Sequence, residues 1–566
     1  MTSYAIKGSD IFVRALENEG VEYVFGVPGE ENLDMLESLR TSRIKVVVTR
    51  HEQVAGFMAA TYGRFTGKPG VCLSTLGPGA TNLVTAAAHA SLGGMPMLMI
   101  TGQKPVLQSR QAQFQIIDTV SMMRPLTKSA KQVIDAGNIP TLVRDAFRVA
   151  EAERPGPVHL ELPEDIAAQL TERSAVVPVS AAFRTVAAEE AIVRAATAIA
   201  GARNPLVMIG GGANRPGLAP ALSAAVRRLK VPFFNTQMGK GAVDGNSELF
   251  VGTAALSEGD YVHLAIERAD LIVAVGHDTA EKPPFIMRAG GPQVVHVDFN
   301  VADIDQIYFP QVEVVGDIAD SMARLASELD GKLTHDPVYF QKIRAQILEH
   351  VAEGADDPRY PLAPQRLVAD VRKVMPDDGI ICLDNGMYKI WFARNYRTHI
   401  ANTILLDNAL ATMGAGLASA MIAALLYPDR RVMAICGDGG FMKNSQDLET
   451  AIRLGLNLVV LIIEDRGYGM IRWKQESMGF GDFALSFENP DFVKYAEAYG
   501  AKGARVGATD DLVPILDAAF KAGGVRLVVA PIDYSENKRV LIDELKAKVA
   551  RSFDLTPRPQ PLISMP

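Results

Sequence analysis

Cysteine is scarce in this sequence, and basic charge is not in excess. Only three cysteines occur among the 566 residues, Cys72, Cys382 and Cys436, and none belongs to a CxxC pair. An odd number of widely spaced cysteines in apolar runs favours reduced, buried thiols in a cytoplasmic protein over a disulfide framework. The formal net charge of -8, without any basic run, argues against a nucleic-acid-binding surface.

Uninterrupted apolar runs of membrane-spanning length are also absent. The N-terminal segment carries charges throughout, so we expect no secretory signal peptide. The stretches 76–103 and 408–428 lack charged residues, but Gly, Pro, Thr, Ser or Asn interrupts each, and both are richer in alanine than in leucine. We therefore expect buried helices of a large α/β protein at these positions, and no membrane partner.

The chain is too long for one hydrophobic core. Short β-rich apolar runs alternate with helical patterns in three groups, which predicts an α/β fold of three doubly wound parallel-sheet domains. Weakly patterned linkers separate the groups. The predicted domains are residues 1–170, 185–335 and 360–550, followed by a tail at 551–566.

A lone aspartate stands between glycines in "CGDGGF", where a strand-like run passes into a helical pattern. A second buried run, "LVVLII", ends in "EDRGYGM", so Asp438 and Asp465 are expected at one sheet edge on adjacent strands. The glycine amides suit phosphate oxygens, and a divalent cation such as Mg²⁺ would relieve the repulsion between a diphosphate and two carboxylates. For "GDG" alone, a simple turn would be the better interpretation. The second acidic strand end and "GYG" favour the metal–diphosphate site.

These residues resemble the diphosphate and magnesium motif of thiamine-diphosphate-dependent enzymes. That family usually carries Asn where this chain has Asp465, which keeps the oxygen ligand and adds negative charge. The resemblance implies metal ligands at Asp438, Asp465 and the Gly467 carbonyl. It also implies cofactor contacts from Gly437, Asp438, Gly439, Gly440, Tyr468, Gly469 and Met470.

A second motif, "TRHEQVAGF", places Glu52 at the end of a strand entering a helix. A carboxylic acid bonded to the aminopyrimidine ring of the cofactor drives that ring to its imino form, which then takes the reactive proton. A His-Glu-Gln triplet alone would be read as a solvated helix start; joined to "GPGATN" downstream, Glu52 is predicted to be catalytic. The resemblance adds cofactor contacts at Pro28, Gly77 and Asn82.

A third motif, "NALATMGAG", contains a methionine at the position where the family presses a bulky side chain between the two cofactor rings. The resemblance assigns this role to Met413. It also implies that the Ala411 carbonyl holds the amino group of the cofactor's pyrimidine ring. Without the other motifs, Met413 would be an ordinary core methionine. Further cofactor contacts are expected in "DNGMYKIW", at Asn385, Gly386, Met387 and Tyr388. We also expect Asn444 and Asp447 to cap the helix that follows "GDGG".

The resemblance covers nearly the whole chain and is closest to the catalytic subunits of acetolactate synthases. In "RQAQFQIID", Phe114 and Gln115 would border the second-substrate pocket. The adjacent histidines of the pyruvate decarboxylase branch are absent, and Glu52 distinguishes the chain from the glyoxylate carboligases. The motifs "DNGMYKIW" and "YFPQVEVVGDIA" resemble the catabolic, flavin-free type, so FAD is possible but not predicted. The turn "GGGANRPG" lacks the glycine spacing of a nicotinamide site.

The resemblance implies pyrimidine-binding, central and diphosphate-binding domains, thiamine diphosphate and Mg²⁺ as cofactors, and a homodimer or homotetramer with active sites at the subunit interface. The expected reaction decarboxylates pyruvate and adds the fragment to a second 2-oxo acid, giving 2-acetolactate. Trp473 and Lys474 are assigned to the substrate pocket, where Lys474 binds an acceptor carboxylate or points to solvent. The alternatives are another 2-oxo acid decarboxylase, a 2-hydroxyacyl-CoA lyase, or a non-catalytic cofactor-binding regulatory protein.

Overall fold

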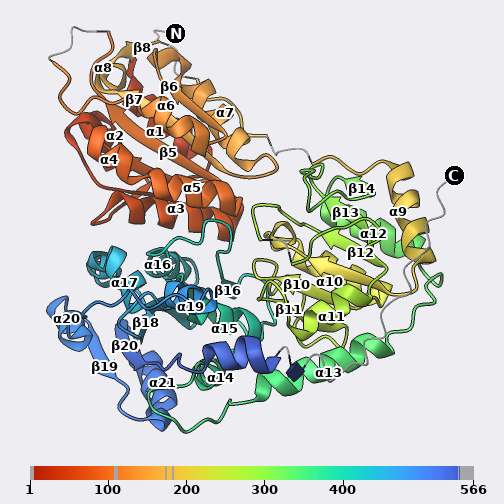
Figure 1. Ribbon diagram of the computed structural model, residues 1–566. Coiled ribbons are helices and arrows are strands. Elements are labelled where there is room, and N and C mark those ends of the chain that lie inside the picture. Colours follow the sequence, from red (N-terminus) through yellow and green to blue (C-terminus); the bar gives the residue numbers. More distant parts are fainter. Residues whose placement is uncertain are drawn as a thin grey trace.

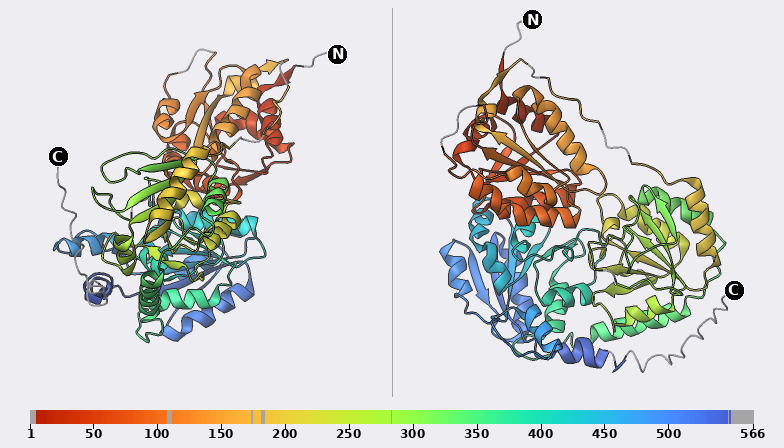
Figure 2. Two further views of the ribbon diagram at one scale, coloured as in Figure 1. Left: turned by 90° about the vertical axis from the view of Figure 1, so that its right-hand side faces the viewer. Right: turned by 45° about the horizontal axis from the view of Figure 1, so that its top comes forward.

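Three six-stranded parallel sheets, each with helices on both faces, form the protein (Figure 1). The computed structural model describes residues 5–107, 112–172, 175–180, 184–282, 284–545 and 547–548. We call the three sheet domains, in chain order, the N-domain (up to about residue 170), the central domain (from about 185 to 335) and the C-domain (from about 360). The N-domain lies over the C-domain, and the central domain lies beside both (Figure 2). The predicted fold class is confirmed. The predicted tail at 551–566 lies outside the described residues.

The N-domain sheet has the strand order β3-β2-β4-β5-β7-β6. Its strands are β2 (Tyr23–Gly26), β3 (Lys45–Val48), β4 (Gly70–Ser74), β5 (Met97–Gln103), β6 (Ser129–Gln132) and β7 (Pro157–Pro163). One face packs on α1 (Gly8–Asn18), α2 (Leu33–Arg40) and α7 (Ile139–Glu151), and the other on α3 (Glu52–Thr66) and α5 (Val84–Gly93). Every residue of β5 and β7 is buried, as expected for a parallel sheet covered on both sides. The short strands β1 (Ile6–Lys7) and β8 (Leu170–Thr171) pair separately.

The C-domain repeats the topology of the N-domain. Its sheet has the order β16-β15-β17-β18-β20-β19, so both sheets read 2-1-3-4-6-5 when each is numbered from its own first strand. The strands are β15 (Ile380–Leu383), β16 (Ile404–Leu405), β17 (Val432–Gly437), β18 (Leu458–Glu464), β19 (Lys502–Arg505) and β20 (Val525–Pro531). The helices are α14 (Pro364–Val374), α15 (Tyr388–Asn395), α16 (Gly416–Leu426), α17 (Asp438–Asn444), α18 (Leu448–Arg453), α19 (Gly469–Ser477), α20 (Phe492–Ala498) and α21 (Leu512–Ala522).

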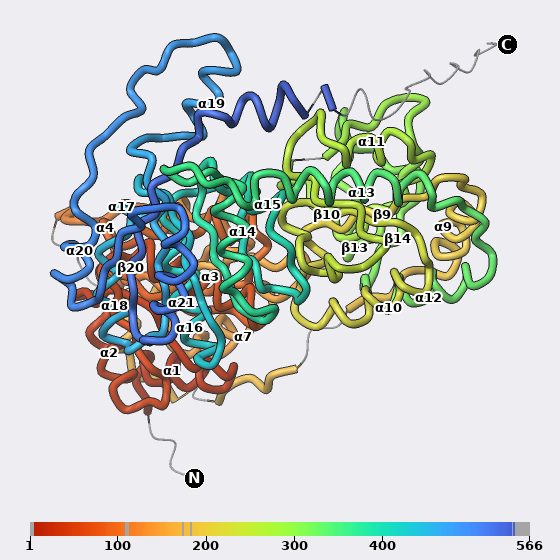
Figure 3. Tube along the Cα trace, turned by 90° about the horizontal axis from the view of Figure 1, so that it is seen from below, coloured from red at the N-terminus to blue at the C-terminus, as the bar shows by residue number. Residues whose placement is uncertain are grey.

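The central domain has a different order, β11-β10-β9-β12-β13-β14, which reads 3-2-1-4-5-6. This is the order of doubly wound dinucleotide-binding folds, and it establishes architecture without establishing a ligand. The strands are β9 (Pro205–Ile209), β10 (Phe233–Thr236), β11 (Phe250–Ala254), β12 (Leu271–Val275), β13 (Gln293–Asp298) and β14 (Val312–Val315). The helices are α9 (Glu189–Gly201), α10 (Ala219–Leu229), α11 (Tyr261–Arg268), α12 (Ile318–Glu328) and α13 (Val338–Ala352), and α13 runs beside the domain towards α14 (Figure 3).

The N- and C-domains share a core between α3 and α16. Buried residues of both helices belong to one apolar cluster, and small side chains let the helices approach closely. The hydroxyl oxygens of Thr61 and Ser419 lie 3.0 Å apart in this contact. Of the two charge-free stretches, 408–428 contains the helix α16, whereas 76–103 forms helices only up to Gly93 and then the buried strand β5. Among the described residues, every helix is too short or too polar to cross a bilayer. The three cysteines are buried and free, as predicted.

Candidate active site

The carboxyl edge of the C-domain sheet holds a cavity of about 240 Å³, at the point where the strand order reverses between β15 and β17. Every cofactor and metal residue that the sequence predicts in the C-domain lines it. These are Asn385, Gly386, Met387, Tyr388, Ala411, Met413, Gly437, Asp438, Gly439, Gly440, Asp465, Gly467, Tyr468, Gly469 and Met470. Side chains and carbonyls up to 85 residues apart in the chain are therefore brought to one surface.

Asp438 is held rigidly at the start of α17. One carboxylate oxygen accepts the Gly439 N–H (2.8 Å), and the other accepts the backbone N–H of Arg466 (2.7 Å) and of Asp465 (3.2 Å). The same oxygen accepts the side-chain amide of Asn489 at 2.8 Å. Burial raises the pKa of Asp438, although these hydrogen bonds act to lower it. Asn489 was missed by sequence reasoning, because it lies 51 residues from Asp438 outside any motif.

Asp465 follows β18, and its Oδ2 is buried without a hydrogen-bond partner among the described residues. Burial and the nearby charge of Asp438 raise its pKa to about 7. Two adjacent carboxylates with an unsatisfied oxygen fit a divalent cation. No group of three or more His, Cys, Asp and Glu side chains gathers in the described part of the chain, so further ligands must be carbonyl, phosphate or water oxygens. Mg²⁺ takes such a ligand set, with Gly467 as the predicted carbonyl.

Glycines keep the cavity open beside the two aspartates. A Cβ on Gly440 would lie 2.7 Å from Asp384 Oδ2, and one on Gly469 would lie 2.7 Å from Asp465 Oδ2. A phosphate group can thus approach the backbone amides of this turn closely. Tyr388 and Tyr534 also line the cavity with hydroxyls that are buried and have no partner among the described residues. Tyr534 was not predicted, since it follows β20 in a segment without a recognisable motif.

The predicted N-domain residues gather at the carboxyl edge of their own sheet. Glu52 is the first residue of α3, and its Oε2 accepts the Asn82 side-chain amide at 2.9 Å. Pro28 follows β2, and Gly77 follows the neighbouring β4. Gly77 has a φ of +43°, and a Cβ there would meet the Gln115 carbonyl oxygen at 2.6 Å. The Phe114 side chain next to it is 68% exposed.

The two sets of residues do not share a cavity within one chain. No described N-domain residue lines the C-domain cavity. The start of α3 instead meets the far end of α17, where Gln53 Oε1 accepts the Asn444 side-chain amide at 3.1 Å. Asn444 ends α17 and Asp447 precedes α18, so both stand at N-cap positions of the next helical segments, but neither side chain makes a capping hydrogen bond. The Asn444 amide also donates to the Gly414 carbonyl at 2.9 Å. Asp438 occupies the opposite end of α17.

The predicted substrate residues Trp473 and Lys474 lie on α19 outside the cavity. Only the first turn of α19 lines it, through Gly469, Met470 and Ile471. Lys474 is exposed, and Trp473 packs partly against the C-domain core. The helix and the segment after it extend away from the sheet layers (Figure 3).

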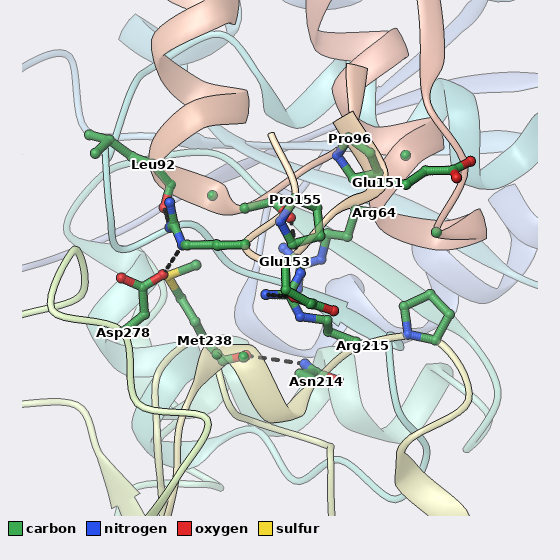
Figure 4. A pocket seen from close by; sticks show the side chains of 18 of the residues that line it. Arg64, Leu92, Pro96, Glu151, Glu153, Pro155, Asn214, Arg215, Met238 and Asp278 are labelled. Atoms are coloured by element: carbon green, nitrogen blue, oxygen red, sulfur yellow. Dashed lines mark hydrogen bonds and ion pairs between the residues drawn. The ribbon is translucent and has the colours of Figure 1, made fainter. Parts of the chain in front are cut away.

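A second cavity, of about 270 Å³, lies between the N-domain and the central domain and includes the "GGGANRPG" turn (Figure 4). Charged side chains of both signs line it and pair across the domain boundary. Arg154 forms an ion pair with Asp278, and Arg215 lies 3.2 Å from Glu153. The Asn214 amide donates to the Met238 carbonyl at 3.1 Å. The two ion pairs bind the N-domain to the central domain, whereas the Asn214 bond lies within the central domain; neither FAD nor a nicotinamide is assigned to the cavity.

Comparison with known proteins matches this arrangement. Three family models cover the chain: the thiamine pyrophosphate enzyme N-terminal TPP binding domain at residues 6–122, the central domain at 192–325 and the C-terminal TPP binding domain at 384–530. The chain is 32% identical to an acetolactate synthase of Bacillus subtilis (strain 168), over 95% of each chain. It is 34% identical to a catabolic acetolactate synthase of Raoultella terrigena, over 94% of this chain and 96% of that one.

Other relatives include the acetolactate synthase isozyme 2 large subunit of Escherichia coli (strain K12), 30% identical over 94% of this chain and 96% of that one. The resemblance seen in the motifs is confirmed, and with it thiamine diphosphate as the cofactor. The chain belongs to the thiamine pyrophosphate enzyme family.

Proposed function

We propose that the protein is an acetolactate synthase of the catabolic, flavin-free type. It decarboxylates pyruvate and joins the two-carbon fragment to a second 2-oxo acid, giving 2-acetolactate from two molecules of pyruvate. The observation that carries the proposal is the single cavity lined by all predicted C-domain cofactor residues, in a chain with intact Glu52. The names of the full-length relatives support the choice of reaction within the family.

Thiamine diphosphate supplies the ring that accepts the electron pair released when carbon dioxide leaves. Asp438 and Asp465 would hold Mg²⁺, and the glycine turn would admit the phosphate oxygens of the diphosphate. Met413 and the Ala411 carbonyl would orient the two rings of the cofactor, and Glu52 would keep a proton at the pyrimidine nitrogen. The apolar part of the cavity, including Met387 and Met470, excludes water from the reacting carbon.

We propose that the active site is completed by a second copy of the chain. Because Glu52 lies at the far end of α17 from Asp438 in its own chain, the N-domain edge of one subunit would cover the cavity of another. Exposed apolar side chains on both surfaces support this arrangement. Phe114 beside Gly77 is 68% exposed, and Phe483 beyond α19 is 80% exposed. A homodimer is then the smallest active unit, and a homotetramer is two of them.

The remaining assignments concern substrate and location. We place Phe114 and Gln115 at the acceptor pocket from the partner side, with Trp473 and Lys474 just beyond the first turn of α19. Lys474 is exposed in the single chain, and docking of a second copy would bring it near the acceptor carboxylate. Three free, buried cysteines support a cytoplasmic location.

Purified protein with pyruvate, thiamine diphosphate and Mg²⁺ should release carbon dioxide and form acetolactate without added flavin. Mass spectrometry of the product, from pyruvate alone and from pyruvate with 2-oxobutyrate, identifies the acceptor. Acetaldehyde as the sole product would contradict carboligation and indicate a decarboxylase. Formation of neither product would favour a non-catalytic cofactor-binding protein. The same interpretation would be favoured if Glu52→Gln left any measured activity unchanged.

A further inference from the structure

Three buried ionisable side chains converge behind the cofactor loop, and no step of the proposed reaction uses them. They are Lys389 in the first turn of α15, Asp407 after β16 and His89 on α5 of the N-domain. All three are less than 9% exposed. Isolated buried charges are unfavourable, so their presence here needs a specific set of partners.

Asp407 binds the backbone of the loop that carries Ala411. Its Oδ2 accepts the Ala411 N–H at 2.8 Å, and its Oδ1 accepts the Ala409 N–H at 3.1 Å. Ala411 has a φ of +54°, in the left-handed region that a residue with a Cβ adopts at an energetic cost. The carboxylate therefore holds an unfavourable backbone conformation in place, at a residue that lines the cofactor cavity.

Lys389 secures both sides of the same loop. Its ammonium donates to the Asp407 carbonyl (2.9 Å), to Asn408 Oδ1 (3.3 Å) and to Asn385 Oδ1 (2.7 Å). The Asn385 amide in turn donates to the Thr412 carbonyl at 2.7 Å. All three ammonium hydrogens are thus directed at the loop or at the residue that holds its other end.

His89 connects the loop to the N-domain. Its Nδ1 lies 3.5 Å from Asp407 Oδ2, and its ring packs edge-on against Phe57 with the centroids 5.2 Å apart. Burial alone would raise the pKa of Asp407, but His89, the Ala409 N–H and the charge of Lys389 hold that pKa well below its usual range. Asp407 is therefore an anion, with both oxygens engaged.

We propose that Asp407, supported by Lys389 and His89, is a positioning residue that keeps Ala411 in its left-handed conformation and so presents the Ala411 carbonyl and Met413 to thiamine diphosphate. The inference rests on the proposed roles of Ala411 and Met413. It predicts that the network acts through backbone conformation at one residue. An ordinary core network would instead affect only overall stability.

The test uses Asp407→Asn, with cofactor affinity measured by equilibrium dialysis against thiamine diphosphate in excess Mg²⁺. The asparagine amide group faces a backbone N–H where a carboxylate oxygen stood, so binding should weaken about tenfold. Adding Ala411→Gly should restore about fivefold of this loss, since glycine adopts positive φ without the Cβ clash. Ala409→Gly is the matched control: Ala409 binds the same carboxylate but does not have a positive φ, and it should restore nothing.

Unchanged affinity in Asp407→Asn, or equal rescue by both glycines, would overturn the proposal, as would no rescue by Ala411→Gly. If Asp407→Asn does not fold, as judged by circular dichroism, Lys389→Met replaces it in the same assay. That variant should weaken cofactor binding several-fold, and wild-type affinity would refute the proposal. Failure of the wild-type protein to bind thiamine diphosphate would instead refute the proposed function, so the two failures are distinguishable.

Discussion

The repulsion between Asp438 and Asp465 predicts that one substitution stabilises the metal-free protein. Asp465→Asn removes a charge but keeps an oxygen at the same position. Burial and the charge of Asp438 raise the pKa of Asp465 from 3.8 to about 7. At about 1.4 kcal/mol for each pKa unit, the unfavourable term approaches about 4 kcal/mol at pH 8. Relaxation and partial hydration reduce this, and we expect Asp465→Asn to gain about 2 kcal/mol.

The stability difference between Asp465→Asn and the metal-free wild type should depend on pH. The folded chain keeps a proton on Asp465 up to about pH 7, whereas the unfolded chain releases it near the ordinary value of 3.8. The metal-free wild-type protein therefore loses stability as the pH rises through this interval. The asparagine variant does not titrate there. Its advantage should be about a quarter of the full value at about pH 4.5 and largest at pH 8.

The assay is thermal unfolding after chelation of metal ions, at both pH values, with wild-type protein as the reference. A gain of about 2 kcal/mol corresponds to roughly 4–8 °C for a domain of this size. With Mg²⁺ and thiamine diphosphate added, the wild type should become the more stable protein. It holds the cation with two carboxylates, whereas the variant holds it with one carboxylate and one amide oxygen and therefore more weakly. An equal melting temperature at pH 8 without metal, or the same difference at both pH values, would refute the electrostatic argument.

Three further substitutions test other parts of the site and its support. Glu52→Gln should lower acetolactate formation at least 100-fold while leaving dialysis affinity for thiamine diphosphate nearly unchanged, because the amide cannot supply the proton. Gly440→Ala should abolish cofactor binding, since its Cβ would lie 2.7 Å from Asp384 Oδ2; retained affinity would mean that the turn moves freely. Asp260→Asn breaks a buried ion pair with Arg394 (2.6 and 2.9 Å) between the central and C-domains, and chemical denaturation should show a loss of about 3–5 kcal/mol.

Motifs in the sequence brought the predicted C-domain residues to one cavity, because strand ends in a parallel sheet must meet at one edge. Asp438 and Asp465 are a clear example: each follows a run of buried residues, and β17 and β18 are adjacent. The segment from β4 to β5 and the segment from β17 to β18 each read strand, glycine turn, helix, strand, and they form the third and fourth strands of two sheets with one topology.

Other residues could not be found in this way. Asn489 and Tyr534 reach the site from loops whose course depends on packing of the whole domain. Asn444 matched a capping pattern, yet the chain ends one helix there and uses the amide for a contact between domains. Lys389 lies within "DNGMYKIW", but no local pattern reveals its function, because that function depends on a loop almost twenty residues away.

The core shared by α3 and α16 has a consequence for how the chain can be divided. If the chain is cut between residues 172 and 184, the two fragments should stay associated through that core. The cut protein should therefore keep its hydrodynamic size on gel filtration. The first 170 residues produced alone would instead expose a broad apolar surface to solvent and precipitate.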